Sequence, residues 1–343
     1  MNSNLSHIKY LLKLMPLILL LLFCSAAWGA GPLPRNVHVA DVTPASFTVV
    51  WTTDSASTGN IQVYADVLAT IPVTGTVIEQ DFVLGEDNAP AIAAENIGVL
   101  RTRVSGLSPN IPYFFRTLTT PKAGGLTVSL PASGALYSVI TEKESFPVTA
   151  NGLGVQVKDA GGITPLPGAV ALIQVTGAHY PLSALAGDGH SGSLATVDLA
   201  NLYNSGTGVT MSTLGGESAV ITVIGGTSGN ASNTAVLNTN DGMGTLQILA
   251  GDVVLQPYVD SDNDGMPNDY ETANGLSPFN NADGALDADG DGLTNLQEYI
   301  RGTNPKVKDS DGDGLQDSTE VNSVGTLPSE PDTEGTAALT EMR

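Results

Sequence analysis

The most constraining feature of this sequence is an acidic pattern that recurs three times in the last quarter of the chain. Segments 260–271, 287–298 and 309–320 each carry Asp at positions 1, 3 and 5, Gly at position 6 and Glu at position 12. Alternate carboxylates on a tightly curved loop point toward one centre, and the glycine permits the sharp turn. Because the register is identical in all three segments, the pattern predicts three cation-binding loops rather than a solvated acidic tail.

The spacing matches the twelve-residue calcium loop, so Ca²⁺ is the predicted cofactor. Calcium takes about 6 to 8 oxygen ligands, supplied here by side chains at positions 1, 3, 5, 9 and 12 and by the backbone carbonyl of position 7. Without the ion these carboxylates would repel one another, so calcium is expected to fold the segment as well as bind to it. The predicted ligands are Asp260, Asp262, Asp264, Met266, Asn268 and Glu271 in the first loop, Asp287, Asp289, Asp291, Leu293, Asn295 and Glu298 in the second, and Asp309, Asp311, Asp313, Leu315, Asp317 and Glu320 in the third.

Two features of residues 258–325 distinguish this calcium segment from paired EF-hands. Position 8, apolar in paired EF-hands, is Pro267, Thr294 or Gln316, and the turn 302–305 reads Gly-Thr-Asn-Pro. With these features the segment resembles bacterial thrombospondin type 3 repeats, which implies a rod-like array around a line of calcium ions. Only short helices are expected, such as one over 293–301. A dockerin, which carries two loops in a compact pair, is the competing family.

The first 29 residues have the layout of a secretory signal peptide. Lys9 and Lys13 precede an apolar run over 17–23, and small residues follow up to Ala30. This order predicts cleavage near Gly29 and a secreted, extracellular or cell-surface protein with no membrane span in the mature chain. Cys24 is the only cysteine. Its removal would leave the mature chain without cysteine, so bound metal is expected to take the place of disulfides in the acidic segment.

Residues 33–142 read as a first β-sandwich, because short alternating apolar runs are separated by turn residues. The run 46–53 contains Trp51, and the stretch 107–116 reads Leu-Ser-Pro-Asn-Ile-Pro-Tyr-Phe-Phe-Arg, with Tyr113 at its centre. These segments resemble the core tryptophan strand and the tyrosine corner of a fibronectin type III domain. The resemblance implies that Trp51 fills the space between two sheets and that the Tyr113 hydroxyl reaches the backbone. The stretch 66–98 is longer than such a domain needs and suggests an enlarged loop or hairpin.

Residues 146–257 predict a second β-sandwich with an aliphatic core, because aromatic residues nearly vanish there. Segments 165–170 and 193–202 loosely resemble carboxypeptidase-regulatory-like sandwiches, and an immunoglobulin-like sandwich remains an alternative. The expected fold class is therefore all-β: two sandwiches in tandem, then a loop-rich calcium-stabilised repeat segment with short helices. A flexible tail is expected over 326–343.

The residues favour a non-enzymatic function. No nucleophile elbow, P-loop or HExxH motif occurs, and His179, His190 and Asp188 form only a weak metal-site pattern. The net charge of −22 argues against nucleic-acid partners. We expect a calcium-binding extracellular or cell-surface protein with a structural or adhesive role, whose partner is another surface or matrix protein or a glycan. The alternative is a carbohydrate-binding or accessory protein of a secreted hydrolase system.

Overall fold

A computed structural model describes most of the chain after residue 32. The described residues are 33–80, 89–132, 136–146, 148–149, 151–188, 192–238, 246–248, 251–256, 258–324 and 327–329. The predicted signal peptide, Cys24, His190 and residues 330–343 of the predicted tail lie outside them. Within these ranges no helix is both long and apolar enough to cross a membrane.

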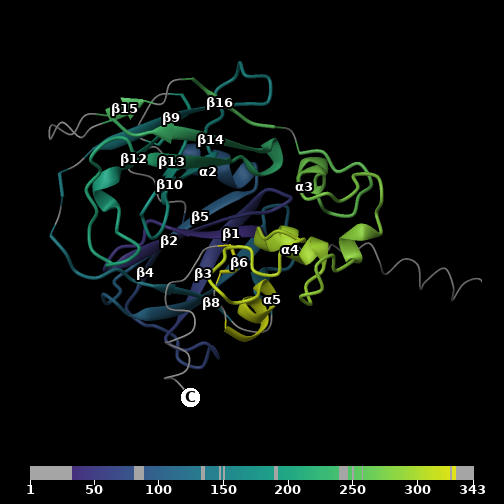
Figure 1. Cartoon of the computed structure of the whole chain (residues 1–343), viewed down its shortest axis with the longest axis horizontal. Coiled ribbons are helices and arrows are strands. Elements are labelled where there is room, and N and C mark those ends of the chain that lie inside the picture. Colours follow the sequence, from purple (N-terminus) through teal and green to yellow (C-terminus); the bar gives the residue numbers. More distant parts are fainter. Residues whose placement is uncertain are drawn as a thin grey trace, which may run out of the picture. The chain divides into compact units, whose positions relative to one another are not determined.

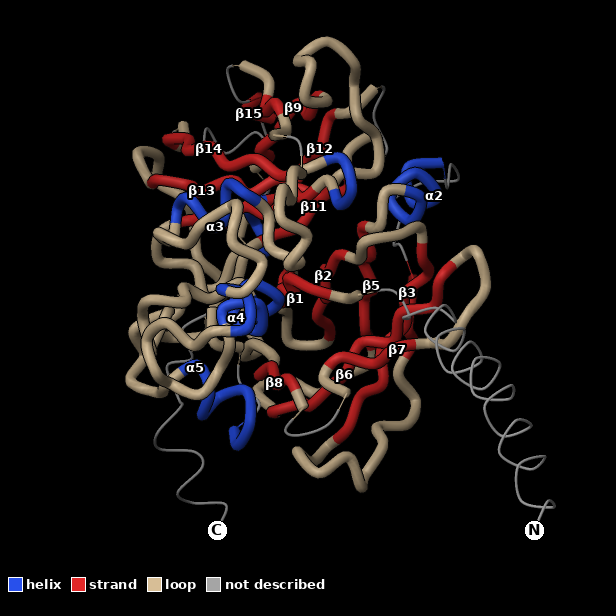
Figure 2. Tube along the Cα trace, turned by 90° about the vertical axis from the view of Figure 1, so that its right-hand side faces the viewer, coloured by secondary structure: helices blue, strands red, loops and turns tan. Residues whose placement is uncertain are grey.

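The first sandwich is built from two antiparallel four-stranded sheets (Figure 2). One sheet has the order β1-β2-β5-β4, with β1 at Arg35–Ala40, β2 at Ser46–Thr52, β5 at Val99–Ser105 and β4 at Val77–Gln80. The other has the order β3-β6-β7, with β8 also on β6; its strands are β3 (Ser57–Tyr64), β6 (Pro112–Pro121), β7 (Val128–Leu130) and β8 (Tyr137–Ile140). Apolar side chains from both sheets form one buried cluster between them.

Two aromatic residues take the places that the sequence predicts for them. Trp51 is fully buried between the sheets, and its indole nitrogen donates to the Thr119 hydroxyl at 2.9 Å. The Tyr113 hydroxyl accepts a hydrogen bond from the backbone N–H of Ser108 at 2.9 Å. A buried indole or phenol needs a partner for its polar atom, and both have one here.

The second sandwich also consists of two sheets around an aliphatic core. The first has the order β11-β10-β13-β14, with β11 at Leu182–Leu185, β10 at Val170–Val175, β13 at Ser218–Ile224 and β14 at Asn230–Val236. The second has the order β12-β9-β15 with β16 also on β9; its strands are β12 (Leu194–Asp198), β9 (Gly152–Lys158), β15 (Leu246–Ile248) and β16 (Val253–Val254). Two one-turn helices, η1 (Leu199–Asn201) and η2 (Gly226–Ser228), complete it.

The two sandwiches share a third apolar cluster, formed by the outer faces of one sheet from each. Val50 and Val99 of the first sandwich and Val170 and Leu172 of the second belong to it. The stretch 66–98 contains β4 and a helix, α2 (Ala89–Asn96), and this helix contributes buried alanines to the same cluster. The insertion expected as a loop or hairpin therefore fills part of the contact between the sandwiches.

The calcium segment is loop-rich with short helices, as predicted (Figure 1). These are α3 (Asn268–Ala273), η3 (Asp283–Ala285), α4 (Asn295–Arg301), α5 (Asp317–Thr319) and η4 (Glu320–Val324). Helix α4 begins after a capping box at Thr294 and ends at Gly302, whose φ of 79° suits glycine. The all-β architecture with short C-terminal helices is thus confirmed.

The calcium segment returns to the first sandwich and lies against it. Helix α4 contacts β1. Just beyond the segment, Leu327 lies in the stretch expected as a flexible tail, but it is only 6% exposed and joins the core of the first sandwich. The Tyr258 hydroxyl and that of Tyr299 both accept hydrogen bonds from Arg35 of β1. Chain order would place the segment next to the second sandwich, so this contact is decided by tertiary packing.

Candidate metal centres

The three acidic loops share one hydrogen-bond network, which begins at position 1. The Asp260 carboxylate accepts from the backbone N–H of Asn263 at 2.8 Å and from that of Gly265 at 3.1 Å. Asp287 and Asp309 accept from positions 4 and 6 of their own loops in the same way. The first aspartate therefore fixes the curvature of each loop through both of its oxygens.

The backbone at positions 4 and 6 explains why the loop needs special residues there. Asn263 has a φ of +60° and Gly265 a φ of +98°. Asparagine tolerates this left-handed region better than most residues, and glycine has no Cβ to oppose it. The second and third loops carry glycine at both positions, each with positive φ.

At positions 3 and 5, one carboxylate oxygen of each aspartate accepts a backbone hydrogen bond within the loop, and the other faces the centre of the site. In the first loop Asp262 accepts from the N–H of Asp264 at 3.3 Å, and Asp264 accepts from that of Met266 at 2.8 Å. The second oxygen of each carboxylate is buried and has no hydrogen-bond partner within the described residues. The equivalent oxygens of Asp289, Asp311 and Asp313 are in the same state. Buried carboxylate oxygens without partners are costly, and a bound cation would satisfy them.

The glutamate at position 12 completes each loop: Glu271 lies on α3, Glu298 on α4, and Glu320 begins η4. Glu271 and Glu298 are both fully buried, and neither of their carboxylate oxygens has a partner in the described part of the chain. Glu320 is fully buried as well. A bidentate glutamate at this position is what calcium loops use to close the coordination shell.

The first site includes a carboxylate that the sequence analysis missed. Ligand atoms of Asp262, Asp264, Glu271 and Asp283 all lie within 4.8 Å of one another. One oxygen of Asp283 accepts from the N–H of Ser277 at 2.9 Å, while the other is buried without a partner in the described structure. Asp283 lies on η3, twelve residues beyond the loop and outside the twelve-residue template. In the sequence, the only signal for it is that it is an acidic residue with no assigned role.

The electrostatics of the ion-free sites also favour a cation. Burial, followed by repulsion from neighbouring aspartates, raises the pKa of Glu271 to about 7 and that of Glu298 to about 8. Burial raises the pKa of Asp311 to about 7, and the adjacent Asp313 and Asp309 add to the rise. Each group is thus unstable as an anion unless a positive charge enters the site.

The side chain at position 9, predicted as a ligand, makes hydrogen bonds within the loop in this structure. The side-chain oxygen of Asn268, Asn295 or Asp317 accepts from the backbone N–H of position 2, at 2.8 to 3.1 Å. The backbone N–H of each donates to the carbonyl just before its loop. These residues therefore close the base of the loop, and their predicted ligation, direct or through water, stays a prediction.

Position 7 anchors each loop through an apolar side chain. Met266 is fully buried, Leu293 is 3% exposed and Leu315 is half-buried. The side chain fixes the loop while its backbone carbonyl remains the group predicted to bind the ion.

Consecutive loops are joined by direct hydrogen bonds. The Asn295 amide of the second loop donates to the Asp283 carbonyl at 2.8 Å. The Ser318 N–H of the third loop donates to the Asp291 carboxylate at 2.9 Å, and its hydroxyl donates to the Asp291 carbonyl. Cation binding at one site thus also stabilises a predicted ligand, or the first residues of a helix, in the neighbouring site.

His179, one residue of the weak metal-site pattern, pairs with a carboxylate outside that pattern. His179 pairs with Glu142 at 2.7 Å and contacts the Tyr180 ring, with 4.1 Å between ring centroids. His190 lies outside the described residues. This histidine therefore contributes to the contact between the end of the first sandwich, just after β8, and the second sandwich.

The donor set of the acidic sites fits calcium. Every inward-facing group is an oxygen, most are carboxylates, and there is no described cysteine or histidine among them. Hard divalent cations prefer such ligands, and the first site alone offers five carboxylate oxygens that have no partner in the part of the chain that the structure describes.

Comparison with known proteins agrees with this chemistry. Residues 287–308 and 309–328 match the family described as the bacterial TSP3 repeat. Those matches contain the second and third loops, whereas the first loop lies upstream of them. TSP3 repeats bind calcium, so the match supports calcium binding here. No curated protein matches the chain.

Three solved structures show only weak likeness. Purple acid phosphatase PPD1 from yellow lupin (Lupinus luteus) is 14% identical, with 38% of this chain and 24% of that chain covered and a TM-score of 0.22. The chicken CNTN1 FN1–FN3 domains are 13% identical over 67% of this chain and 69% of theirs, with a TM-score of 0.20. The titin domains z1z2 in complex with telethonin are 11% identical over 63% and 98%, with a TM-score of 0.18. Scores this low carry no argument about fold or function, and this chain spans less than a quarter of the phosphatase.

Proposed function

We propose that this chain is a non-enzymatic, calcium-binding extracellular or cell-surface protein with a structural or adhesive role. The observation that carries the proposal is the acidic network repeated in three loops. In it, buried carboxylate oxygens of Asp262, Asp264, Glu271, Asp289, Glu298, Asp311 and Asp313 have no hydrogen-bond partner among the described residues. TSP3 repeats occur in extracellular proteins, which supports the location. Extracellular modules bind calcium at about 10⁻⁴ to 10⁻³ M, and we expect affinities in that range.

Calcium would hold the repeat segment in its folded form against the first sandwich. The ion-free loops bring like charges together, so the segment should loosen when calcium is removed. Because α4 contacts β1 and Leu327 enters the first core, loosening would expose the face of β1. The calcium-bound segment, held rigid on the first sandwich, would instead serve a spacer or docking role toward a surface protein, a matrix protein or a glycan.

Calorimetric titration of the protein lacking residues 1–29 tests the proposal. We expect three calcium ions for the native sequence and two for Glu298→Gln, with a gain of ordered structure by circular dichroism. Asp269→Asn is the matched control, because Asp269 is exposed on α3 and outside the inward-facing set. A flat titration with an unchanged spectrum would refute calcium binding.

The adhesive role needs a separate measurement. A pull-down from extracellular matrix or cell-surface material, run with calcium and with chelator, should retain a partner only when calcium is present. Equal retention under both conditions would contradict a calcium-dependent docking surface.

A further inference from the structure

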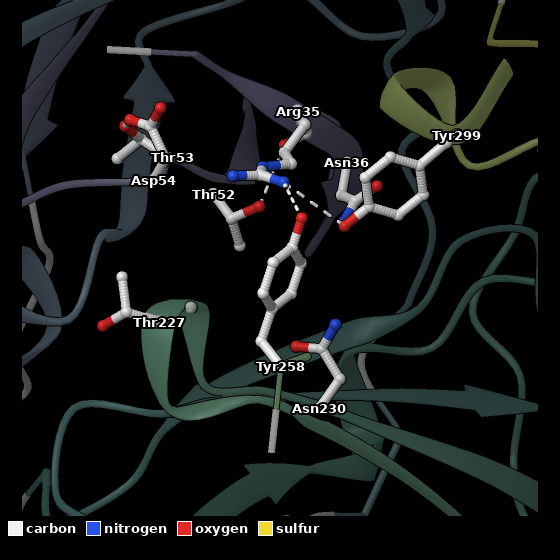
Figure 3. A pocket seen from close by; sticks show the side chains of 10 residues that line it. Arg35, Asn36, Thr52, Thr53, Asp54, Thr227, Asn230, Tyr258 and Tyr299 are labelled. Atoms are coloured by element: carbon white, nitrogen blue, oxygen red, sulfur yellow. Dashed lines mark hydrogen bonds between the residues drawn. The ribbon is translucent and has the colours of Figure 1, made fainter. Parts of the chain in front are cut away.

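A pocket of about 140 Å³ lies where the first sandwich, the second sandwich and the calcium segment meet (Figure 3). Its walls come from β1, from the end of β2 and the two residues after it, from η2 and β14, and from residues on either side of the first two calcium loops. The side chains that matter are Arg35, Asp54, Thr227, Asn230, Tyr258 and Tyr299. Such a volume is below the roughly 300 Å³ typical of drug-sized ligands, so any occupant is small.

Arg35 is a buried cation in this pocket without an acidic partner. Its side chain belongs to a residue that is only 8% exposed, and none of the ion pairs between described residues includes it. One nitrogen, Nη1, donates to the Tyr258 hydroxyl at 3.0 Å and to the Tyr299 hydroxyl at 3.5 Å. The other guanidinium nitrogens make no hydrogen bond to the described residues. None of these nitrogens is among the buried unpartnered side-chain atoms of the described residues, so they face the open pocket, and their N–H donors are available to an anionic oxygen pair.

The tyrosine rings add an apolar and cation-stabilising wall. The guanidinium carbon of Arg35 lies 5.3 Å from the Tyr258 ring centroid and 5.8 Å from that of Tyr299. Both distances are within the range of cation–π contact, which fixes the plane of the guanidinium. Tyr258 is 36% exposed, so part of its surface remains available to a ligand.

The remaining polar groups select against a simple anion. Asp54 lines the same pocket and is exposed; one of its oxygens accepts from the N–H of Leu33 and from the Thr53 hydroxyl. Its charge would repel a bare oxyanion but would accept hydrogen bonds from ligand hydroxyls. Thr227 and Asn230 lie on the opposite wall (Figure 3). The Thr227 hydroxyl donates to the Ile97 carbonyl at 3.2 Å and the Asn230 amide oxygen accepts from the Gly225 N–H at 3.4 Å, which leaves the Thr227 oxygen as an acceptor and the Asn230 NH₂ as a donor for a ligand. The lining therefore suits a ligand that carries a carboxylate and several hydroxyls.

We propose that this pocket binds one sugar-acid residue, a hexuronate, with its carboxylate on Arg35. The sugar ring lies along the Tyr258 face, and the hydroxyls reach Asp54, Thr227 and Asn230. A bidentate carboxylate–guanidinium pair gives the site its specificity for an acidic sugar over a neutral one.

Calcium sets the walls of this site, a part of the inference that rests on the proposed function. Tyr258 lies two residues before the first loop, and its hydroxyl is also hydrogen-bonded to the Gly265 carbonyl at 3.3 Å. Tyr299 directly follows Glu298, the last predicted ligand of the second loop. When the loops are ordered, the Tyr258 and Tyr299 hydroxyls are held within hydrogen-bond distance of Arg35. Affinity for the uronate should therefore fall when calcium is removed.

Binding of D-glucuronate to the protein lacking residues 1–29, measured by calorimetry in excess calcium, tests the site. We expect D-glucuronate to bind and D-glucose to bind at least about 10-fold more weakly. Arg35→Gln should weaken glucuronate by about 10- to 100-fold, as expected for loss of a charge-assisted contact. Arg116→Gln is the matched control, since Arg116 also lies over a tyrosine, at 5.5 Å from the Tyr64 centroid, but outside this pocket.

The outcomes separate this inference from the proposed function. Calcium binding without glucuronate binding, equal affinity for glucose, or full affinity in Arg35→Gln would each overturn the sugar site alone. Glucuronate binding by a protein that takes up no calcium would support the site and refute calcium binding. If Arg35→Gln does not fold by near-ultraviolet circular dichroism, Asn230→Ala replaces it, because Asn230 is exposed and its amide is expected to contribute several-fold.

Discussion

Replacing Asp283 by asparagine tests whether the first metal centre extends beyond its twelve-residue loop. The substitution keeps the shape of the side chain and leaves an oxygen that can accept from Ser277. It removes one negative charge from a group of four carboxylates whose ligand atoms lie within 4.8 Å of one another. Its effect should therefore have opposite signs with and without calcium.

The magnitudes follow from the geometry. Two unit charges 4.8 Å apart repel by about 3.5 kcal/mol at an effective dielectric constant of about 20, and by about 1 kcal/mol in bulk water. Protonation of Glu271 relieves part of this repulsion in the ion-free protein. We expect Asp283→Asn to raise the ion-free free energy of unfolding by about 1–3 kcal/mol. Losing a charged ligand should weaken calcium at the first site by about 10- to 100-fold.

Urea denaturation of decalcified protein and calorimetric titration with calcium measure the two effects. Asp269→Asn changes net charge by the same amount on an exposed position of α3, and it should alter neither quantity appreciably. The reasoning is refuted if Asp283→Asn leaves calcium affinity unchanged, or if it destabilises the ion-free protein as well.

Three further predictions concern pH, the first core and the contact between the sandwiches. The folded-state pKa values of Glu271 (about 7) and Glu298 (about 8) lie above the usual value of 4.5. The ion-free protein should therefore lose stability as pH rises from 5 to 8.5, and urea midpoints that stay constant without calcium would contradict this. Trp51→Ala should lower the free energy of unfolding by about 3–5 kcal/mol in excess calcium, measured by urea denaturation; a loss under 1 kcal/mol would mean that the indole does not fill the core. Gly226→Ala would place a Cβ 2.0 Å from a backbone oxygen of the first sandwich, whereas Gly216, also at positive φ, has nothing within 4 Å. Thermal unfolding should show a loss of at least about 3 kcal/mol for Gly226→Ala and about 1–2 kcal/mol for Gly216→Ala, and equal losses would argue against the close contact.

The sequence by itself determined the features whose partners lie close together along the chain. Each acidic loop places its curvature-setting aspartate, its glycine and its closing glutamate within twelve residues, so the spacing alone predicts the loop. The same holds for the Tyr113 corner, whose backbone partner is five residues away. Trp51 was predictable because a tryptophan in an alternating strand must find a core.

The insertion at α2 and the neighbouring strand assignments were harder to predict. A short alanine-rich helix has little periodic signal, and its burial depends on a second sandwich that meets it through long-range contacts. Strands β11 and β14 are equally hard to predict, because a fully buried four-residue strand and an exposed polar edge strand both lack clear alternation.

Only the tertiary structure decided which distant groups meet at the sites. Asp283 joins the first metal centre because η3 turns it back toward the loop, and no template position marks it. The side chain at position 9 closes the loop base, although the template alone suggests a ligand. Arg35 meets Tyr258 and Tyr299 across more than 220 residues of chain. Such contacts depend on how the folded domains pack against one another, and the spacing of residues within a short stretch of sequence carries no information about that packing.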